Sequence, residues 1–475
     1  MSRSAADKVR EAGGEALLER LLFLDQLTAG AKSPGATQPI ASDGSLDFDV
    51  VLLGGGLSLV YAPLLADAGF RVAVVERSRA GVAHREWNAS RAELQVLVDN
   101  KLVTAAELDQ ELIVAQYDYG IFRWHGAGEQ RVNNVLDCAL DAGPLLAKVR
   151  ERAEAKGVVF FDHCSVHGET ANQYGVALAL REESCPARLT AHVVVDERGS
   201  ASPYAAADLI CPTVGGVLQG LEVGDGPKQI QPNVGEILVT TEGIQAGRQH
   251  LWEAFPGRPG DTTVYLFYYA EAHTRRPGAL LDLYARFFDT LGSYKAGEAR
   301  LLRPTFGFIP GWTRLSPGPN SGHPRIVLVG DAGARHSPLT FCGFGATLRA
   351  LPQIVPVVEA AMQGVVRSFD EASVHRGTGA LAMLLARPPS GARQANDWNE
   401  LFDAAFSTLE SMGPEPFQRL LRDEMGEAEF IRFLTRTSVK RPRVYLDVAR
   451  QLGLGRTMRW GAGLFGPAAF RSSLG

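Results

Sequence analysis

The chain has 475 residues, of which 45% are hydrophobic and 21% charged, and its formal net charge is −5 at pH 7. This length allows two or three domains with a large buried core, and the composition is typical of an ordinary globular protein. The acidic balance and the lack of a basic block argue against a nucleic-acid partner.

The cysteines are scattered and form no CxxC pair: they are Cys138, Cys164, Cys185, Cys211 and Cys342. This pattern indicates reduced thiols in a cytoplasmic protein and predicts no metal or iron–sulfur site. The N-terminal segment carries charges and no apolar signal region, and no apolar run is long enough to span a bilayer. We therefore expect neither secretion nor a membrane span, although attachment to a membrane surface is compatible with this composition.

Residues 5–27 mix apolar and charged side chains with helical spacing. Two interpretations are open: an amphipathic helix packed on the body of the protein, or a helix lying on a membrane surface. Residues 28–45 are rich in small residues, proline and glycine, which is typical of a linker.

Residues 49–76 carry the pattern of a dinucleotide-binding unit. An apolar strand leads into Gly54-Gly55-Gly56, a helix follows as far as Gly69, and a second apolar strand ends at Glu76. Glycines let the backbone approach a pyrophosphate, and the acid accepts a hydrogen bond from a ribose hydroxyl. The unit by itself fits NAD and FAD equally well.

The glycine fingerprint is imperfect in either register. If Gly54 is the first glycine, Leu59 stands where the third belongs; one residue earlier, Leu53 stands first and Ser58 last. Comparison with the second motif described below favours the earlier register, with Gly55 close to the pyrophosphate and Ser58 at the helix-packing position.

The next segment is predicted to alternate helices and strands. Capping boxes at Ser90 with Glu93 and at Thr104 with Glu107 predict two short helices in succession. Residues 135–156 are typical of one long helix. Strands are predicted at 158–161, 175–181 and 191–196, and the last of them stops at Asp196.

Residues 211–310 have a different character. The segments 236–241, 250–255 and 262–269 are typical of strands separated by Gly/Pro turns, so we expect an antiparallel sheet that forms a substrate domain. A helix is predicted over 278–291. The expected division is a helix and linker at 1–47, the first part of the dinucleotide domain at 48–210, the substrate domain at 211–324, the second dinucleotide part at 325–365 and a helical region at 366–475.

A second strand, 325–329, ends at Gly330-Asp331, and Pro338, Gly343 and Gly345 follow at a helix start. The remainder of the chain is predominantly helical by pattern. Its end could be a segment lying on a membrane surface or a core-facing tail. It lacks acids and carries Arg450, Arg456, Arg459 and Arg471 among Leu452, Leu454, Met458, Trp460, Leu464, Phe465 and Phe470.

The strand ends at Gly54, Asp196 and Gly330-Asp331, in this order, resemble those of the FAD-binding superfamily of aromatic hydroxylases, geranylgeranyl reductases and lycopene cyclases. The resemblance implies an α/β fold with a Rossmann-like FAD-binding domain, an inserted antiparallel-sheet substrate domain and a helical C-terminal region. Asp331 would accept from the ribitol chain of the flavin, and N–H groups near Gly343 would face its isoalloxazine ring. The cofactor residues that we expect are Gly54, Gly55, Gly56, Ser58, Glu76, Arg77, Arg91, Asp196, Gly330, Asp331, Pro338, Gly343 and Gly345.

Within this superfamily, residues 85–94, 251–256 and 337–345 are similar to the CruA/CruP-type lycopene cyclases. This resemblance implies redox-neutral cyclisation of the ψ ends of lycopene, or of a related acyclic carotenoid, to β-rings. Reduced FAD would assist, with NAD(P)H as a possible external reductant. A carotenoid substrate resides in membrane, so we expect a cytoplasmic protein peripheral to the membrane.

Cyclisation requires a carboxylic acid that apolar surroundings keep protonated. Glu253, between Trp252 and Ala254, is the first candidate for this acid, and Glu236 is the second. The residues expected to line the substrate tunnel are Trp252, Phe255, Tyr265 and Phe267.

Two other functions remain open at this point. One is a redox flavoenzyme, such as a polyene reductase or monooxygenase. The other is a non-cyclising paralogue that binds FAD or carotenoid, which is suggested by Leu53 or Leu59, Ser58 and Cys342 where glycines are common.

Overall fold

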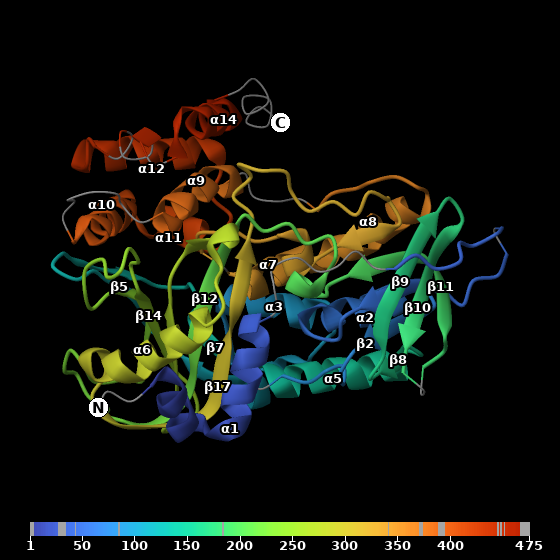
Figure 1. Cartoon of the computed structure of the whole chain (residues 1–475), viewed down its shortest axis with the longest axis horizontal. Helices are drawn as coiled ribbons and strands as arrows, with labels where there is room; N and C mark the ends of the chain where they lie inside the picture. Colours follow the sequence, from blue (N-terminus) through green and yellow to red (C-terminus); the bar gives the residue numbers. More distant parts are fainter. Residues whose placement is uncertain are drawn as a thin grey trace.

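The computed structural model describes residues 4–26, 35–42, 44–83, 86–182, 185–340, 342–369, 374–387, 395–443, 446, 449–450 and 452–465. Within these residues the chain forms two large sheets and a small one, and helices of the C-terminal part stack over one end (Figure 1). The α/β fold with an additional sheet domain, expected from the sequence, is confirmed.

The first sheet has the strand order β8-β2-β1-β11-β10-β9, with β18 beside β11. Its parallel strands are β1 (Phe48–Leu53), β2 (Val72–Glu76), β8 (Val159–Asp162), β11 (Arg188–Asp196) and β18 (Ile326–Leu328). Two antiparallel strands, β9 (Ser165–Asn172) and β10 (Gly175–Arg181), extend it. The parallel strands are apolar on both faces, because helices cover one face and the side chains of the other face pack with apolar residues of β9 and β10.

The helices that pack on this sheet include α2 (Tyr61–Asp67), α5 (Ala142–Ala155) and α8 (Ile354–Met362). Since the carboxyl ends of parallel strands meet at one edge, the segments that follow β1, β11 and β18 lie together there. These segments are the glycine loop after Leu53, Glu197 and Gly330.

The second sheet has the order β16-β12-β15-β14-β13-β5-β6, with β17 beside β12. Its strands are β5 (Tyr119–Arg123), β6 (Glu129–Val132), β12 (Leu209–Leu221), β13 (Val234–Val239), β14 (Leu251–Pro256), β15 (Thr262–Phe267), β16 (Ala270–Glu271) and β17 (Gly297–Gly311). The antiparallel pairing expected for residues 211–310 is present. The sheet also recruits β5 and β6 from the earlier part of the chain, and β5 pairs with β13 in parallel.

One face of the second sheet is covered by α6 (Ala279–Tyr294) and by the N-terminal helix α1 (Ala5–Gln26). Val9, Leu17, Leu18 and Leu21 of α1 are buried against α6 and the sheet. Of the two interpretations of this amphipathic helix, packing on the body is therefore correct.

The small sheet consists of β3 (Glu86–Ala89), β7 (Cys138–Asp141) and β4 (Ile113–Gln116). The long helix predicted from residue 135 was placed too early, because residues 138–141 pair as β7. Helix α5 begins after Asp141, whose side chain accepts the N–H of Gly143 at 3.2 Å. Both predicted capping boxes are present, at the starts of α3 (Arg91–Asp99) and α4 (Ala105–Glu107).

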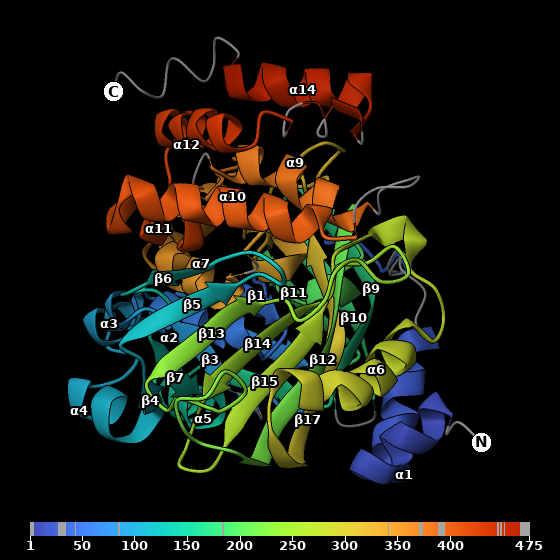
Figure 2. The same ribbon diagram turned by 90° about the vertical axis from the view of Figure 1, so that its left-hand side faces the viewer.

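The helical C-terminal region consists of α9 (Val374–Ala386), α10 (Asp397–Met412), α11 (Pro414–Leu421), α12 (Glu427–Lys440) and α14 (Leu454–Phe465). In two views at right angles these helices form a stack, with α14 outermost (Figures 1 and 2). Phe402 of α10 stacks on Trp124, directly after β5, and Phe406 stacks on Phe122 of β5, so the helices and the second sheet share one core. Among the described helices none is both long and apolar enough to cross a bilayer.

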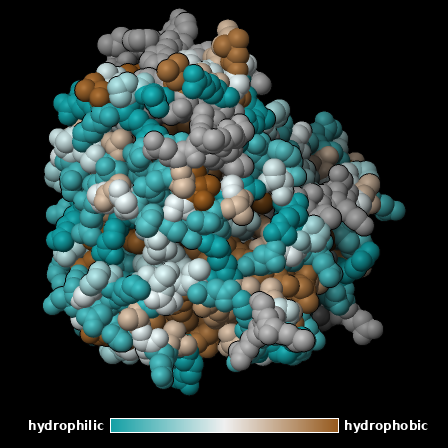
Figure 3. Space-filling model, turned by 60° about the vertical axis from the view of Figure 1, so that its left-hand side comes forward, coloured by the Kyte–Doolittle hydropathy of each residue, from teal (hydrophilic) through white to brown (hydrophobic). Residues whose placement is uncertain are grey.

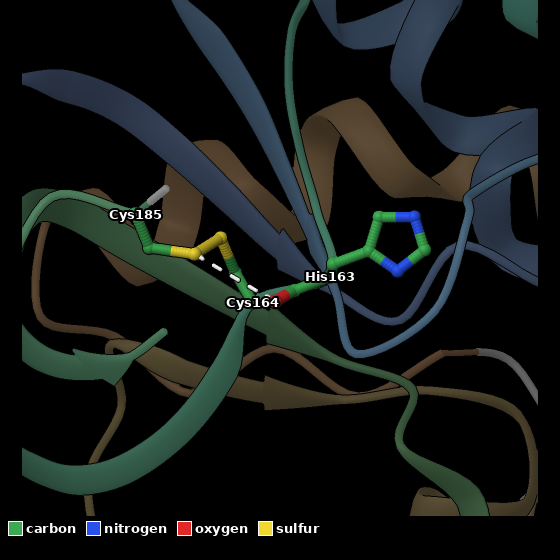
Figure 4. The surroundings of a disulfide bond; sticks show 3 residues. All are labelled: His163, Cys164 and Cys185. Carbon is green, nitrogen blue, oxygen red and sulfur yellow. Dashed lines mark hydrogen bonds between the residues drawn. A yellow bond between two sulfur atoms is a disulfide. The ribbon is translucent and has the colours of Figure 1, made fainter. Parts of the chain in front are cut away.

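One expectation about the cysteines is wrong. Cys164 and Cys185 form a disulfide, with their Cα atoms 6.0 Å apart (Figure 4). Cys164 follows β8 and Cys185 lies in the connection between β10 and β11, so the folded strands bring together residues that are separated by 21 positions. Cys138, Cys211 and Cys342 are free thiols, as expected.

Candidate functional site

A cavity of about 730 Å³ lies between the carboxyl edge of the first sheet and the inner face of the second sheet. Its volume is in the range of cavities that hold small molecules and cofactors. The C-terminal helices close it on one side through Phe402 and Phe406 of α10 and through Leu420 and Leu421 of α11. Residues far apart in the sequence therefore build this one site.

The glycine loop forms one end of the cavity. Gly54 has φ +114°, a conformation that favours glycine, and Gly55 packs so closely that a Cβ there would lie 2.4 Å from the Cβ of Ala80. Gly56 has open space where a side chain would begin, and it lines the cavity. The glycine of this loop that opens on the cavity is thus Gly56, whereas the sequence had predicted Gly55 to lie close to the pyrophosphate.

Two carboxyl groups bind amides of this loop. Glu76, at the end of β2, accepts the N–H of Gly55 at 2.8 Å, and its other oxygen accepts from Ser78. Glu197, directly after β11, accepts the N–H of Ser58 at 2.5 Å. The hydroxyl of Ser58 is buried and has no hydrogen-bond partner among the described residues.

Glu197 is a site residue that the sequence analysis missed. Burial, together with the nearby carboxyl groups of Asp331, Asp196 and Glu76, raises the pKa of Glu197 well above its usual range. The signal was available, because Glu197 follows a predicted strand whose end meets the glycine loop. Asp196, the residue predicted from the sequence, is fully buried, accepts hydrogen bonds from Arg198 and Ser202, and is not part of the cavity wall.

The second motif lies at the same edge of the sheet. Gly330, Asp331 and Gly343 line the cavity, and Gly343 begins helix α7 (Gly343–Ala350). Gly345 faces away from the cavity, since a Cβ there would lie 2.4 Å from a carboxyl oxygen of Glu93. Pro338 is buried behind the wall.

Two further predicted cofactor residues lie away from the cavity, and two residues of the family-like motifs lie outside the described part of the chain. Arg77 is exposed, and Arg91 forms an ion pair with Asp109 at 2.8 Å; neither lines the cavity. Arg85 and Phe341 of the family-like motifs lie outside the described residues.

Glu253 lies on the inner face of the second sheet and lines the cavity. The residues beside it on this wall are mainly aromatic, and they include Phe255, Tyr265, Phe267 and Tyr269. Burial in these surroundings raises the pKa of Glu253 from 4.5 to about 8. Glu253 has no hydrogen-bond or ion-pair partner within the described part of the chain.

Trp252 and Glu236 occupy the opposite face of the same sheet, because successive residues of a strand point to opposite faces. Trp252 stacks on Tyr294 with ring centroids 4.8 Å apart, beneath α6. Glu236 is ion-paired with Lys295 at 2.8 Å and accepts from the Tyr294 hydroxyl. Neither lines the cavity, so the structure separates both of them from Glu253.

No protein-family model matches the chain, and no curated protein matches its sequence. Solved structures do match. A geranylgeranyl bacteriochlorophyll reductase-like protein of Thermoplasma acidophilum is 15% identical over 85% of this chain and 98% of its own, with a TM-score of 0.58. The halogenase PltM in complex with phloroglucinol and FAD is 12% identical over 90% and 98%, with a TM-score of 0.55.

The Diels-Alderase PyrE3 of the biosynthetic pathway of pyrroindomycins is 17% identical over 80% of this chain and 81% of its own, with a TM-score of 0.53. At such identities the likeness concerns the fold alone. The chain therefore has the fold of geranylgeranyl reductase-like flavoproteins and flavin-dependent halogenases, and its chemistry has to be argued from its own site.

Proposed function

We propose that this protein is an FAD-dependent lycopene cyclase, which closes the ψ ends of lycopene or a related acyclic carotenoid into β-rings. The observation that carries the proposal is Glu253, a carboxyl group in the aromatic part of the cavity with a pKa of about 8. Such a group is protonated at neutral pH and can donate a proton. The apolar walls around it suit a hydrocarbon substrate.

FAD is the cofactor that we propose for the edge of the first sheet. Its support is the shared fold, the open space at Gly56, and the position of Asp331 and Gly343 along the cavity wall. Gly56 would face the pyrophosphate, Asp331 the ribitol chain and Gly343 the isoalloxazine ring. Bound reduced FAD would supply negative charge that stabilises a carbocation nearby. Among the residues that line the cavity, Glu197 conflicts with this fit, because its carboxyl group accepts the N–H of Ser58.

The proposed reaction begins when Glu253 transfers its proton to the terminal double bond of the ψ end, which leaves a tertiary cation. The neighbouring double bond attacks the cation and closes the ring. Loss of a ring proton to the Glu253 carboxylate then restores the acid, so atoms and electrons balance without net oxidation or reduction. The rings of Phe255, Tyr265 and Phe267 would stabilise the cation, by about 2 kcal/mol or more for each ring in a desolvated site.

We also propose that the outer C-terminal helices contact a membrane surface, where such a substrate resides. Val439, Leu454 and Met458 are 79%, 77% and 65% exposed, and hydrophobic groups stand out at the top of the molecule in Figure 3. Arg450 is also exposed. Apolar side chains among cations favour a surface with anionic lipids. The side chains of Arg459, Trp460, Leu464, Phe465, Phe470 and Arg471 lie outside the described residues.

A redox flavoenzyme acting on a polyene is the second candidate. Its support is the fold that the chain shares with the reductase-like protein, and this fold does not by itself distinguish reduction from cyclisation. Incubation of the reduced protein with lycopene separates the two. A cyclised product of unchanged mass supports the cyclase, and a product that has gained hydrogen or oxygen supports the redox enzyme.

A further inference from the structure

The carboxyl group of Glu197 lies against the glycine loop, at the end of the cavity where the pyrophosphate of the proposed cofactor would bind. Its oxygen accepts the N–H of Ser58 at 2.5 Å, and the side chain also lines the cavity. On the far side of the same carboxyl group, a Cβ at Gly330 would lie 3.2 Å from the other oxygen. The Glu197 carboxyl group therefore lies between the two motifs that meet at this edge of the sheet.

We propose that Glu197 competes with the pyrophosphate of the cofactor for the amide of Ser58, and so lowers the affinity of this protein for FAD. The inference rests on the proposed function, because it concerns the cofactor site of that enzyme. FAD binds after the side chain has left the amide. In the protein without cofactor, the Glu197 side chain thus takes the place of the phosphate, and binding of FAD displaces it.

The surroundings of Glu197 explain why an acid can reside there. Asp331, Asp196 and Glu76 face it, as does the buried Tyr61. Of these acids, Asp196 is neutralised by Arg198. Burial among like charges favours the neutral carboxyl group, which still offers an oxygen to the Ser58 amide. Glu197 therefore competes with FAD because its oxygen accepts the N–H of Ser58, not because it is charged. A neutral side chain with an oxygen at the same place should compete with FAD in the same way.

FAD has to break the hydrogen bond between Glu197 and the Ser58 amide before it binds, so removal of this hydrogen bond is expected to tighten FAD binding by about tenfold. The test is titration of the apoprotein with FAD, followed by flavin fluorescence, for wild type, Glu197→Ala and Glu197→Gln. Riboflavin, which lacks the pyrophosphate, is the comparison ligand. Glu298→Gln, at an exposed acid of β17, is the matched control for a loss of one charge.

We expect Glu197→Ala to bind FAD about tenfold more tightly than wild type, with riboflavin unchanged. Glu197→Gln keeps an oxygen of the same reach and is expected to stay close to wild type. Should Glu197→Ala not fold, Glu197→Ser replaces it, since its side chain is too short to reach the amide. Three results would overturn the inference. The first is unchanged or weaker FAD binding by Glu197→Ala or Glu197→Ser, and the second is an equal gain in affinity for riboflavin. The third is a Glu197→Gln variant that binds FAD as tightly as Glu197→Ala. If wild type and all variants fail to bind FAD, the proposed function itself fails.

Discussion

Glu253 on β14 pairs directly with Tyr265 on β15, so the two side chains leave the second sheet on the same face. This face lines the cavity, and Phe255 and Phe267 belong to it as well. Because of this pairing, the neighbours of the Glu253 carboxyl group on this face are aromatic and not charged. It is this relationship that makes Glu253 a proton donor in the proposed reaction.

The first prediction concerns the acid itself. Glu253→Gln removes the proton but keeps the size of the side chain, and we expect activity to fall by about two to four orders of magnitude. The variant should remain folded and should still bind FAD, because Glu253 has no ion-pair partner among the described residues to lose. Product formation, thermal unfolding and flavin content together check this expectation.

Glu236→Gln is the matched control on the same sheet. It breaks the buried ion pair with Lys295, whose side chain is 1% exposed. A buried lysine that has lost its partner lowers the free energy of unfolding by about 3–5 kcal/mol. We expect a loss of stability with activity per folded molecule retained. If Glu236→Gln abolished activity in folded protein while Glu253→Gln did not, the assignment of the acid would be wrong.

The second prediction is a pH dependence. The acid must be protonated, and its pKa is about 8, so activity should be level below this pH and fall as the pH rises through about 8. The folded-state pKa lies above the ordinary value of 4.5, so the contribution of Glu253 to stability is full below pH 4.5 and is lost as the pH rises through about 8. Unfolding free energies of wild type and Glu253→Gln, measured from pH 5 to 9, should therefore diverge in favour of the variant at high pH. Parallel curves would contradict the raised pKa.

The third prediction concerns the disulfide. Its half-cystines are 21 residues apart, and closing such a loop stabilises a protein by about 3 kcal/mol. We expect a Cys164→Ser/Cys185→Ser variant, and equally wild type under reducing conditions, to unfold at lower denaturant concentration than oxidised wild type. The variant serves as its own control, because reductant should not destabilise it further. Two alkylatable thiols at these positions in the protein as purified without reductant would show that the bond is absent.

The fourth prediction concerns the outer helices. Leu454→Ser combined with Met458→Ser should weaken binding to vesicles that contain anionic phosphatidylglycerol, because it removes exposed apolar area among arginines. Val223→Ser, at an aliphatic residue shortly after β12 that is 62% exposed, is the control. Truncation after residue 440 should abolish binding altogether. Vesicle co-sedimentation that is the same for all four proteins would remove the support for a membrane contact.

Local patterns predicted much of the fold, because strand and helix periodicity reflects burial at each position. The capping boxes at Ser90 and Thr104 and the strand at 175–181 are present as expected, since a few neighbouring residues determine them. The start of α5 was missed because residues 138–141 pair with strands distant in the sequence. The Cys164–Cys185 bond likewise depends on how three strands fold back on one another.

The site could be predicted in part for a related reason. Glu253, Phe255, Tyr265 and Phe267 are on the cavity wall, and strand alternation alone would have assigned Trp252 to the other face. The sequence of α10 does not indicate that this helix closes the cavity through Phe402, because the position of the helix depends on packing against residues distant in the sequence. Glu197 lies beside a predicted strand end, but its hydrogen-bond partner, the amide of Ser58, is 139 residues away in the sequence, so local patterns could not predict their contact.

The central claim is that this cavity cyclises a polyene by proton transfer from Glu253. The most direct measurement is incubation of the purified, FAD-loaded and reduced protein with lycopene, followed by chromatography and mass spectrometry of the pigments. We predict a product with β-rings and the mass of lycopene, formed by wild type and not by Glu253→Gln. A product heavier by hydrogen or oxygen, or cyclisation at the wild-type rate by Glu253→Gln, would contradict the claim.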